Sequence, residues 1–364
     1  MKNDFIDRLN KIEEALNQAL SMDFSQNWQQ HSFSQLPDAV KKSFIQNLIQ
    51  PNKDLIDLGG KRWRPLLLIL SYELSKNFYD NSISEEETYA LTPLVEFVHT
   101  ASLIHDDIED SADLRRGKPS AYITYGLDTA LNAASWLYFE APVCLNSTCL
   151  TDSLKLTFYN LYTNELRRLH LGQAMDIYWH RNKDVFPSQE EYMSMVKCKT
   201  GTLASLAAKV GFTAGGADAD ACAKIGEIAA NIGIGFQIID DVINLTKGNP
   251  GKKRGDDIVE GKKSMPVLIH ISSRPEDKEK ISALMERAQK EGIDSSAVEE
   301  CIALLEKSGC IQKAAELGKE LIHKNCRDFA GFFKGFESQH SSNAESTASL
   351  ITDLFDSMIP KDFK

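Results

Sequence analysis

Residues 103–110, LIHDDIED, join an apolar run to four acids, and this first acidic motif determines which fold the sequence predicts. Residues 236–244, FQIIDDVIN, form a second acidic motif of the same design. On a helix, Asp106 and Asp110 lie one turn apart on one face, and the second motif repeats this spacing. Carboxylates so close together repel one another, and Mg²⁺ prefers such oxygen ligands. Either motif alone also fits a solvated acidic helix end, but the apolar flanks favour helices that bring metal ligands to the edge of a core.

Apolar residues elsewhere recur with the helical period, and no stretch alternates like a strand. One such stripe runs through Phe5, Ile6, Leu9, Ile12, Leu16 and Leu20, and another through Ile302, Leu304, Leu305, Ile311, Ala314, Leu317 and Leu321. Glycine and proline fall between these stretches, at Pro51, 59–60, 117–119, 215–216 and 248–251, which predicts turns there. The polar tract 341–349 is expected to be a loop. The fold class predicted is all-α.

Composition excludes several functions. A net charge of −11 and a pI near 5.3 argue against a nucleic-acid surface. The seven cysteines are odd in number and lack the paired spacing of a zinc site, so we expect reduced thiols. Apolar runs such as 65–70 are too short to span a bilayer, so no transmembrane segment is expected. A cytoplasmic protein is predicted.

Basic segments accompany both acidic motifs. GGKRWRP at 59–65 places three cations after two glycines, where backbone N–H groups and side chains can bind a phosphate. RRGKP at 115–119 follows the first acidic motif, and GKKRGDD at 251–257 and EGKKSMP at 260–266 follow the second. Each basic segment alone also fits a solvated surface or the neutralisation of nearby acids. The repeated order of acids followed by cations favours a metal-bound diphosphate site.

In this order, together with Gly172-Gln173, Asp176 and Lys199-Thr200-Gly201, the motifs resemble those of trans-isoprenyl diphosphate synthases, the polyprenyl synthetase family. The resemblance covers nearly the whole chain. It implies one domain over 1–364 with the isoprenoid synthase fold, antiparallel helices around a deep central cavity, and the acidic motifs facing each other across its mouth. Residues 1–35 are expected to form an amphipathic helical extension, and residues 338–364 a polar tail and last helix. A homodimer is implied, with transient membrane contact for product release.

The resemblance also assigns roles. Metal binding falls to Asp106, Asp107, Asp110, Gln173, Asp176, Asp240, Asp241 and Asn244, with about three Mg²⁺ ions per site. Isopentenyl diphosphate is assigned to Lys61, Arg64, His99 and Arg116. The allylic diphosphate is assigned to Arg115, Lys199, Lys262 and either Lys252 or Lys253, of which Lys253 is preferred. Catalysis falls to Asp106, Asp107, Asp110, Lys199, Thr200, Gln237 and Asp240, with the Thr200 and Gln237 oxygens facing the developing carbocation.

The implied reaction is ionisation of farnesyl or geranylgeranyl diphosphate, attack by isopentenyl diphosphate and loss of a proton to the departed diphosphate. Product length is expected to depend on Ala101 and Ser102, because small side chains before the first acidic motif leave room for a growing tail. Phe97, a turn further along, is an alternative floor, and the small residues also fit close helix packing. Geranylgeranyl diphosphate is the expected lower limit, and a longer polyprenyl product is favoured.

Other functions remain to be separated from this one. A farnesyl diphosphate synthase is the alternative within the family. A terpene cyclase needs a different second metal motif and has no use for isopentenyl-binding cations such as Lys61, Arg64 and Arg116. A non-catalytic regulatory subunit is expected to have degraded acidic motifs. Two departures from the family pattern are Ala134-Ser135, where a Gly-Asp pair is usual, and Asn244, where the last aspartate of the second motif is usual.

Overall fold

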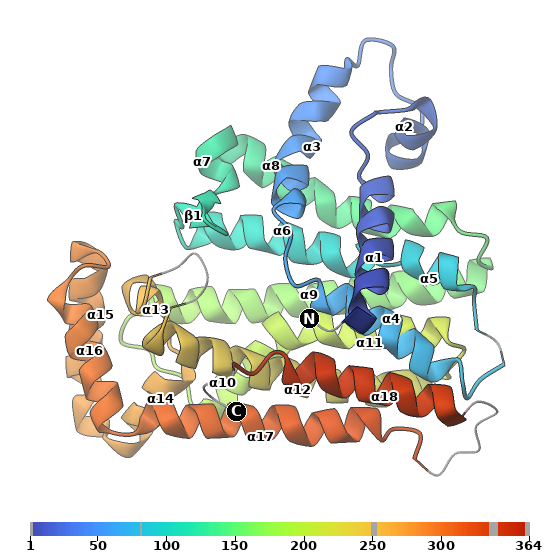
Figure 1. The fold of residues 1–364 in the computed structure, drawn as a ribbon. Coiled ribbons are helices and arrows are strands. Elements are labelled where there is room, and N and C mark those ends of the chain that lie inside the picture. Colours follow the sequence, from blue (N-terminus) through green and yellow to red (C-terminus); the bar gives the residue numbers. More distant parts are fainter. Residues whose placement is uncertain (1–2, 81, 249–252, 335–340, 361–364) are drawn as a thin grey trace. The chain divides into compact units, whose positions relative to one another are not determined.

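A computed structural model describes residues 3–80, 82–248, 253–334 and 341–360 (Figure 1). Helices make up nearly all of the regular structure. Within those ranges the only strands are β1 (Leu114–Arg115) and β2 (Lys118–Pro119), an antiparallel pair with Arg115 opposite Lys118. The predicted all-α class is confirmed.

Contacts divide the chain into two compact units. Unit 1 comprises Met1–Asn164, Leu206–Gly226 and Phe332–Leu354, and unit 2 comprises Glu165–Ser205, Glu227–Gly331 and Phe355–Lys364. Each acidic motif belongs to a different unit. The expectation of one domain over the whole chain stays a prediction.

Unit 1 begins with a 3₁₀ turn and two helices in the predicted N-terminal extension. Its elements are η1 (Asn3–Phe5), α1 (Ile6–Ala19), α2 (Gln26–Phe33), α3 (Lys42–Asp57), α4 (Trp63–Ser75), α5 (Glu85–Ala90), α6 (Pro93–Glu109), α7 (Ala121–Tyr125), α8 (Leu127–Glu140) and η2 (Ala141–Ser147), with parts of α9 (Asp152–Arg181), α11 (Thr202–Ala214), α12 (Ala219–Thr246) and α18 (Ser341–Asp356). The predicted stripe along α1 buries Ile12 and Leu16. In α4, residues 66–70 are all buried, because this helix is covered on every side.

Unit 2 packs the other chemical segments around a second core. Its elements are the rest of α9, α11 and α12, with α10 (Gln189–Val196), η3 (Lys197–Gly201), α13 (Asp256–Glu260), α14 (Met265–Ser273), η4 (Pro275–Asp277), α15 (Lys278–Glu291), α16 (Ser296–Lys307) and α17 (Cys310–Ala330). Apolar residues of α12, such as Ile238 and Val242, pack with Met265 of α14 and Ile302 of α16. The second predicted stripe is divided between α16 and α17 at Gly309, which has φ +70°.

Two expectations about local structure were wrong. Pro51 lies inside α3 instead of in a turn, and its ring is buried, which offsets part of the roughly 3 kcal/mol cost of an interior proline. The tract 341–349 lies in α18 instead of a loop, because Ala344, Thr347 and Ile351 recur on one buried face. Among the described residues, α12 alone is long and apolar enough to cross a membrane by length and composition, and 67% of that window is buried in the protein.

Candidate active site

The first acidic motif forms the last turn of α6. Asp110 caps this helix, and its N–H donates to the Asp106 carbonyl at 2.8 Å, so the two carboxylates lie one turn apart as predicted. Both side chains are half-buried. They therefore combine a fixed helical spacing with access from outside the core, which is what a metal ligand pair needs.

Asp107 points to a different partner. Its carboxyl is only 1% exposed, and its Oδ1 accepts hydrogen bonds from Arg115 Nε, at 2.9 Å, and from Arg115 Nη2. Burial lowers the pKa of Arg115, but the hydrogen bond and the charge of Asp107 raise it by more. The net effect is a raised pKa, so the guanidinium stays charged. Arg115, which is expected to bind the allylic diphosphate, is thus hydrogen-bonded to the first acidic motif.

The cations assigned to isopentenyl diphosphate lie around residues 59–64, GGKRWR, which we call the cation loop. Lys61 is exposed, and Arg64 lies over the Trp63 ring, 4.4 Å from its centroid. Arg64 Nη1 lies 3.5 Å from His99 Nε2 on α6. Burial and the neighbouring Arg64 and Arg116 lower the pKa of His99 well below 6.5, so its imidazole is neutral at pH 7. The structure therefore brings together Arg64 and His99, two of the residues with the same assigned role.

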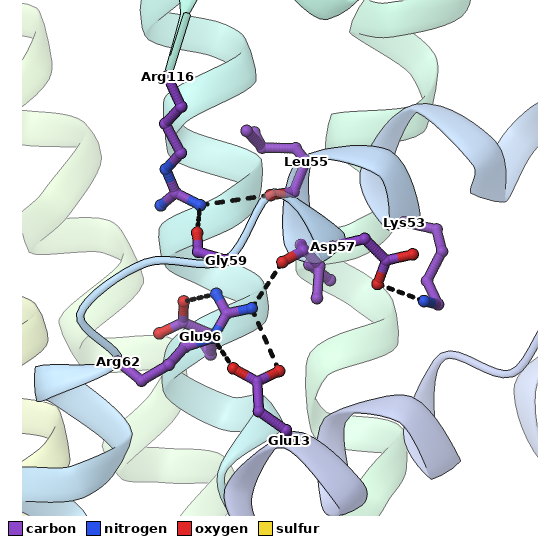
Figure 2. A network of polar contacts seen from close by, with 9 residues as sticks. Glu13, Lys53, Leu55, Asp57, Gly59, Arg62, Glu96 and Arg116 are labelled. Atoms are coloured by element: carbon purple, nitrogen blue, oxygen red, sulfur yellow. Dashed lines mark hydrogen bonds and ion pairs between the residues drawn. The ribbon is translucent and has the colours of Figure 1, made fainter. Parts of the chain in front are cut away.

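Arg116 joins this cluster from the β1–β2 turn. Its Nη1 donates to the carbonyl oxygens of Gly59 and Leu55, the latter at 3.3 Å (Figure 2). A Cβ on Gly60 would lie 3.1 Å from Arg116 Nη2, so the missing side chain makes room for the guanidinium. Arg116 is thereby held against the cation loop.

Arg62 belongs to this loop, and the sequence analysis assigns it no role in the site. It is 4% exposed, and it donates from Nε to Glu13 Oε1 and from Nη1 to Glu96 Oε1, both at 2.7 Å (Figure 2). The two carboxylates come from α1 and α6. Arg62 is therefore an internal ion-pair centre instead of a surface cation.

The residues expected to limit product length have different environments. Ala101 is fully buried, whereas Ser102 is half-buried and donates its hydroxyl to the His99 carbonyl at 2.8 Å. Phe97 is also fully buried. Of these three side chains, Ser102 alone keeps surface that a product tail can touch.

The Ala134-Ser135 departure lies against α6. Ser135 Oγ lies 3.3 Å from His105 Nε2, and His105 immediately precedes the acids of the first motif. The His105 ring also stacks on Tyr138 of α8 with 5.4 Å between centroids. The departure therefore replaces an acid with a hydroxyl in a position that supports α6.

In unit 2, Lys199 and Thr200 lie in η3, a π-helical turn of a kind that often marks functional sites. Lys199 Nζ donates to Asp176 Oδ2 on α9 at 2.7 Å. Burial raises the pKa of Asp176, but the charges of Lys199 and Lys262 lower it below its usual value, so the carboxylate is ionised. This approach requires Gly172, because a Cβ there would lie 2.4 Å from the Lys199 backbone nitrogen.

The second acidic motif is connected to η3 by a chain of side chains. Thr200 Oγ1 donates to Gln237 Oε1 at 3.0 Å, and Gln237 Nε2 donates to Asp241 Oδ1 at 3.3 Å. Asp241 Oδ2 accepts from the Tyr192 hydroxyl at 2.6 Å and from Met265 N at 2.9 Å. Asp241 is 5% exposed, and burial raises its pKa to about 6. Its oxygens are thus occupied by protein donors, so the structure places Asp241 as a support for Gln237.

Asp240 is half-buried, and Asn244, one turn later, is fully buried. Asn244 Oδ1 accepts from Asp257 N at 3.3 Å, and the Asn244 carbonyl accepts from Gly255 N at 2.9 Å. These contacts hold the start of α13 against α12. The metal-binding role of Asn244 stays a prediction, and Asp240 is the more accessible ligand of the pair.

The remaining residues assigned to the allylic diphosphate, Lys262 and Lys253, have different partners. Lys262 pairs with Glu260 at 2.5 Å and also acts on the charge of Asp176. Lys253 forms an exposed ion pair with Asp294 at 3.0 Å. Lys252 lies outside the described residues. Lys262 is therefore grouped with Lys199 around one carboxylate, while Lys253 is directed toward the α15–α16 connection.

The residues present fit Mg²⁺. In the part of the chain that the structure describes, no three acidic, histidine or cysteine side chains gather as a complete metal cage. Mg²⁺ commonly uses only one or two carboxylates and takes its other ligands from water and phosphate. Asp106 with Asp110, and Asp240 in unit 2, supply accessible carboxylates of that kind.

Sequence reasoning missed two supporting residues, Arg62 and Tyr192. The sequence shows Arg62 as a third cation in GGKRWRP, beside Lys61 and Arg64. Its partner Glu96 lies three residues before His99, and that spacing is the only sign in the sequence that the two belong to one cluster. Nothing near Tyr192 in the sequence indicated that its hydroxyl contacts Asp241. Both act by holding other residues, and the metal and substrate assignments themselves stay predictions.

The comparison with known proteins agrees with this arrangement. The sequence model of the family described as Polyprenyl synthetase matches residues 45–305. The chain belongs to the polyprenyl synthetase family. It is 33% identical over 290 residues to a geranylgeranyl pyrophosphate synthase of Apiospora sacchari, covering 79% of this chain and 81% of that protein.

Solved structures show the same fold. A geranylgeranyl pyrophosphate synthetase from Pyrococcus horikoshii Ot3 superposes with a TM-score of 0.76 and 26% identity, covering 96% of this chain and 95% of that one. A heptaprenyl diphosphate synthase from Staphylococcus aureus superposes with a TM-score of 0.73 and 25% identity, covering 97% and 96%. As a member of this family, the chain is a prenyltransferase with the isoprenoid synthase fold, and the family uses divalent metal with diphosphate substrates.

Proposed function

We propose that this chain condenses isopentenyl diphosphate with farnesyl diphosphate to give geranylgeranyl diphosphate. The observation that carries the proposal is that unit 1 and unit 2 each hold accessible acids beside fixed cations, in a chain 33% identical to a named geranylgeranyl pyrophosphate synthase. Longer polyprenyl products are the second candidate, because the Staphylococcus aureus neighbour is named a heptaprenyl synthase and because Ser102, which keeps some accessible surface, is small.

In this proposal Asp106 and Asp110 of unit 1, and Asp240 of unit 2, would be the carboxylate ligands of the Mg²⁺ ions, about three in all, that accompany the allylic diphosphate. When bound, Mg²⁺ supplies positive charge that stabilises the departing diphosphate. Lys199 and Lys262 add fixed positive charge around Asp176.

Thr200 and Gln237 supply oxygens for the developing carbocation, and their mutual hydrogen bond keeps them in place. Arg64 and Arg116 bind isopentenyl diphosphate together with Lys61. The neutral His99 imidazole can orient a phosphate oxygen or Arg64 without adding charge. The final proton passes to the departed diphosphate.

We also propose a homodimer. Leu127, Leu131 and Phe139 form one row along α8 at helical spacing, and Phe139 is 76% exposed. Large apolar side chains in such a row are typical of subunit interfaces. Sedimentation of the wild type and of Phe139→Glu tests this, since the variant should shift toward monomer. A cytoplasmic location stays a prediction of the sequence.

The test of function is incubation with Mg²⁺, isopentenyl diphosphate and each of geranyl, farnesyl and geranylgeranyl diphosphate, followed by product sizing. The expected result is a twenty-carbon product from farnesyl diphosphate. Asp106→Ala should reduce kcat by at least about a hundredfold, because a charge-stabilising ligand is lost. No elongation with any primer, or an unchanged rate for Asp106→Ala, would refute the proposal. A cyclised hydrocarbon product would identify a terpene cyclase instead.

A further inference from the structure

Arg62 has an unusual backbone for an arginine. Its φ is +46°, in the left-handed region that side chains other than glycine rarely adopt. Such a residue persists where its surroundings determine its conformation strongly. Here they do, because the buried guanidinium is bound by Glu13 and Glu96 (Figure 2). It also donates from Nη2 to the Ile56 carbonyl at 2.6 Å.

The conformation of Arg62 affects the whole cation loop. Lys61 precedes Arg62 directly, and Arg64 is the second residue of α4, the helix whose N-cap is Arg62. The backbone at Arg62 therefore sets the direction of Lys61 and the point at which the helix that carries Arg64 begins. The carbonyl of Gly59, in the same loop, accepts from Arg116. Three cations assigned to isopentenyl diphosphate therefore depend on one loop that Arg62 holds in place.

Of the two carboxylates that hold Arg62, Glu13 lies on α1. This helix precedes residues 45–305, the part that matches the family model. Glu13 Oε2 lies 3.4 Å from Arg62 Nη2, in addition to the shorter bond to Nε, so the carboxylate spans two nitrogens of the guanidinium. Charge-assisted pairs of this type fix geometry as well as adding energy.

We propose that Glu13 is a positioning residue for isopentenyl diphosphate: through Arg62, helix α1 sets the conformation of the cation loop and thereby the affinity for this substrate. The inference rests on the proposed function, because it takes isopentenyl diphosphate as the ligand of Lys61, Arg64 and Arg116. It assigns a function to the N-terminal extension beyond burying apolar surface.

The chain provides a matched control on the same helix. Arg8 of α1 forms a two-pronged ion pair with Glu73 of α4, with both hydrogen bonds at 2.8 Å. This pair fastens α1 to α4 without touching the cation loop. Arg8→Gln therefore removes an anchor of α1 but leaves the Glu13–Arg62 contact intact.

The experiment compares Glu13→Gln, Glu13→Asp and Arg8→Gln in the full chain. Steady-state kinetics give the KM for each substrate and kcat, and thermal unfolding gives Tm. Glu13→Gln should raise the KM for isopentenyl diphosphate about fivefold to tenfold, with the KM for the allylic substrate and kcat within about twofold of wild type. Glu13→Asp should recover part of the loss, and Arg8→Gln should lower Tm but leave both KM values unchanged.

A second measurement does not depend on catalysis. An arginine-specific protease does not cut after the exposed Lys61, and Arg62 is buried, so limited proteolysis with such an enzyme followed by mass spectrometry reports release of the cation loop. Cleavage after Arg62 should accelerate in Glu13→Gln and not in Arg8→Gln. Equal cleavage in the two variants, or an unchanged KM for isopentenyl diphosphate in Glu13→Gln, would overturn the inference. A wild-type protein that elongates no primer would instead remove the proposed function, while the cleavage result would still test the coupling of α1 to the loop.

Discussion

Replacing Gly172 by alanine would force apart α9 and the η3 turn that carries Lys199 and Thr200. The new Cβ would lie 2.4 Å from the Lys199 backbone nitrogen, whereas ordinary contact begins at 3.4 Å, so the two backbones must separate by about 1 Å (3.4 − 2.4). Overpacking costs about 1–3 kcal/mol, and the better helix propensity of alanine returns about 1 kcal/mol. A displacement of about 1 Å at catalytic groups can cost about a hundredfold in rate. Gly172→Ala is therefore expected to lower kcat about a hundredfold while lowering the free energy of unfolding by at most about 2 kcal/mol.

The assay is incorporation of labelled isopentenyl diphosphate with farnesyl diphosphate at saturation, alongside chemical denaturation. Ala174→Gly provides the control, because Ala174 is exposed on the same helix and the substitution costs about 1 kcal/mol without a steric contact. Ala174→Gly should keep kcat within about twofold of wild type. A Gly172→Ala protein with kcat within about threefold of wild type would refute the reasoning, since the π-helical turn would then tolerate the shift.

Three further predictions concern other parts of the molecule. Burial raises the pKa of Glu140 from 4.5 to about 7, although the Ser32 hydroxyl donates to it. The folded state therefore favours the protonated acid, and stability should fall as pH rises from about 4.5 to 7, by up to about 3 kcal/mol. Glu140→Gln should match wild type in denaturation at pH 4.5 and exceed it at pH 8; equal stability at both would contradict the assignment. Ser102→Phe should shorten the product at little cost in Tm, whereas Ala101→Phe, at a fully buried position, should lose about 1–3 kcal/mol of stability. Product sizing and the Tm of both variants check this. An unchanged product with Ser102→Phe would show that Ser102 does not limit product length. Tyr192→Phe should lower the free energy of unfolding in urea by about 1–3 kcal/mol and should lower kcat, because Asp241 loses its 2.6 Å donor. Unaltered values would show that this hydrogen bond contributes neither to stability nor to the position of Gln237.

Much of the candidate site was predictable from local spacing. Asp106 and Asp110 lie one turn apart because any α-helix places residues four apart on one face. The helical class followed from apolar periodicity, and the same rule would have identified α18 had Ala344, Thr347 and Ile351 been counted. Polar composition misled the prediction there, since a half-buried helix needs apolar groups on only one face.

The supporting contacts could not be predicted in this way. Arg115 was expected to bind substrate, and the structure also shows it bound to the buried Asp107. Lys253 was preferred as a diphosphate ligand, yet it pairs with Asp294, 41 residues away. A motif shows which chemical groups are present, but their partners come from other elements.

The sequence by itself determined the helical class, the two acidic motifs and the cations that accompany them, because these depend on residue type and on spacing within a few turns. Only the tertiary structure decided which charges are neutralised inside the protein. Arg62 meets Glu13 across 49 residues, and Tyr192 meets Asp241 across another 49. Burial makes such pairings decisive, because a charge or polar group removed from water must find its partner within the fold. Arg62 is buried and bound to carboxylates inside the protein, so it holds the cation loop in place. Lys61 and Arg64 keep accessible surface, so they can bind a substrate.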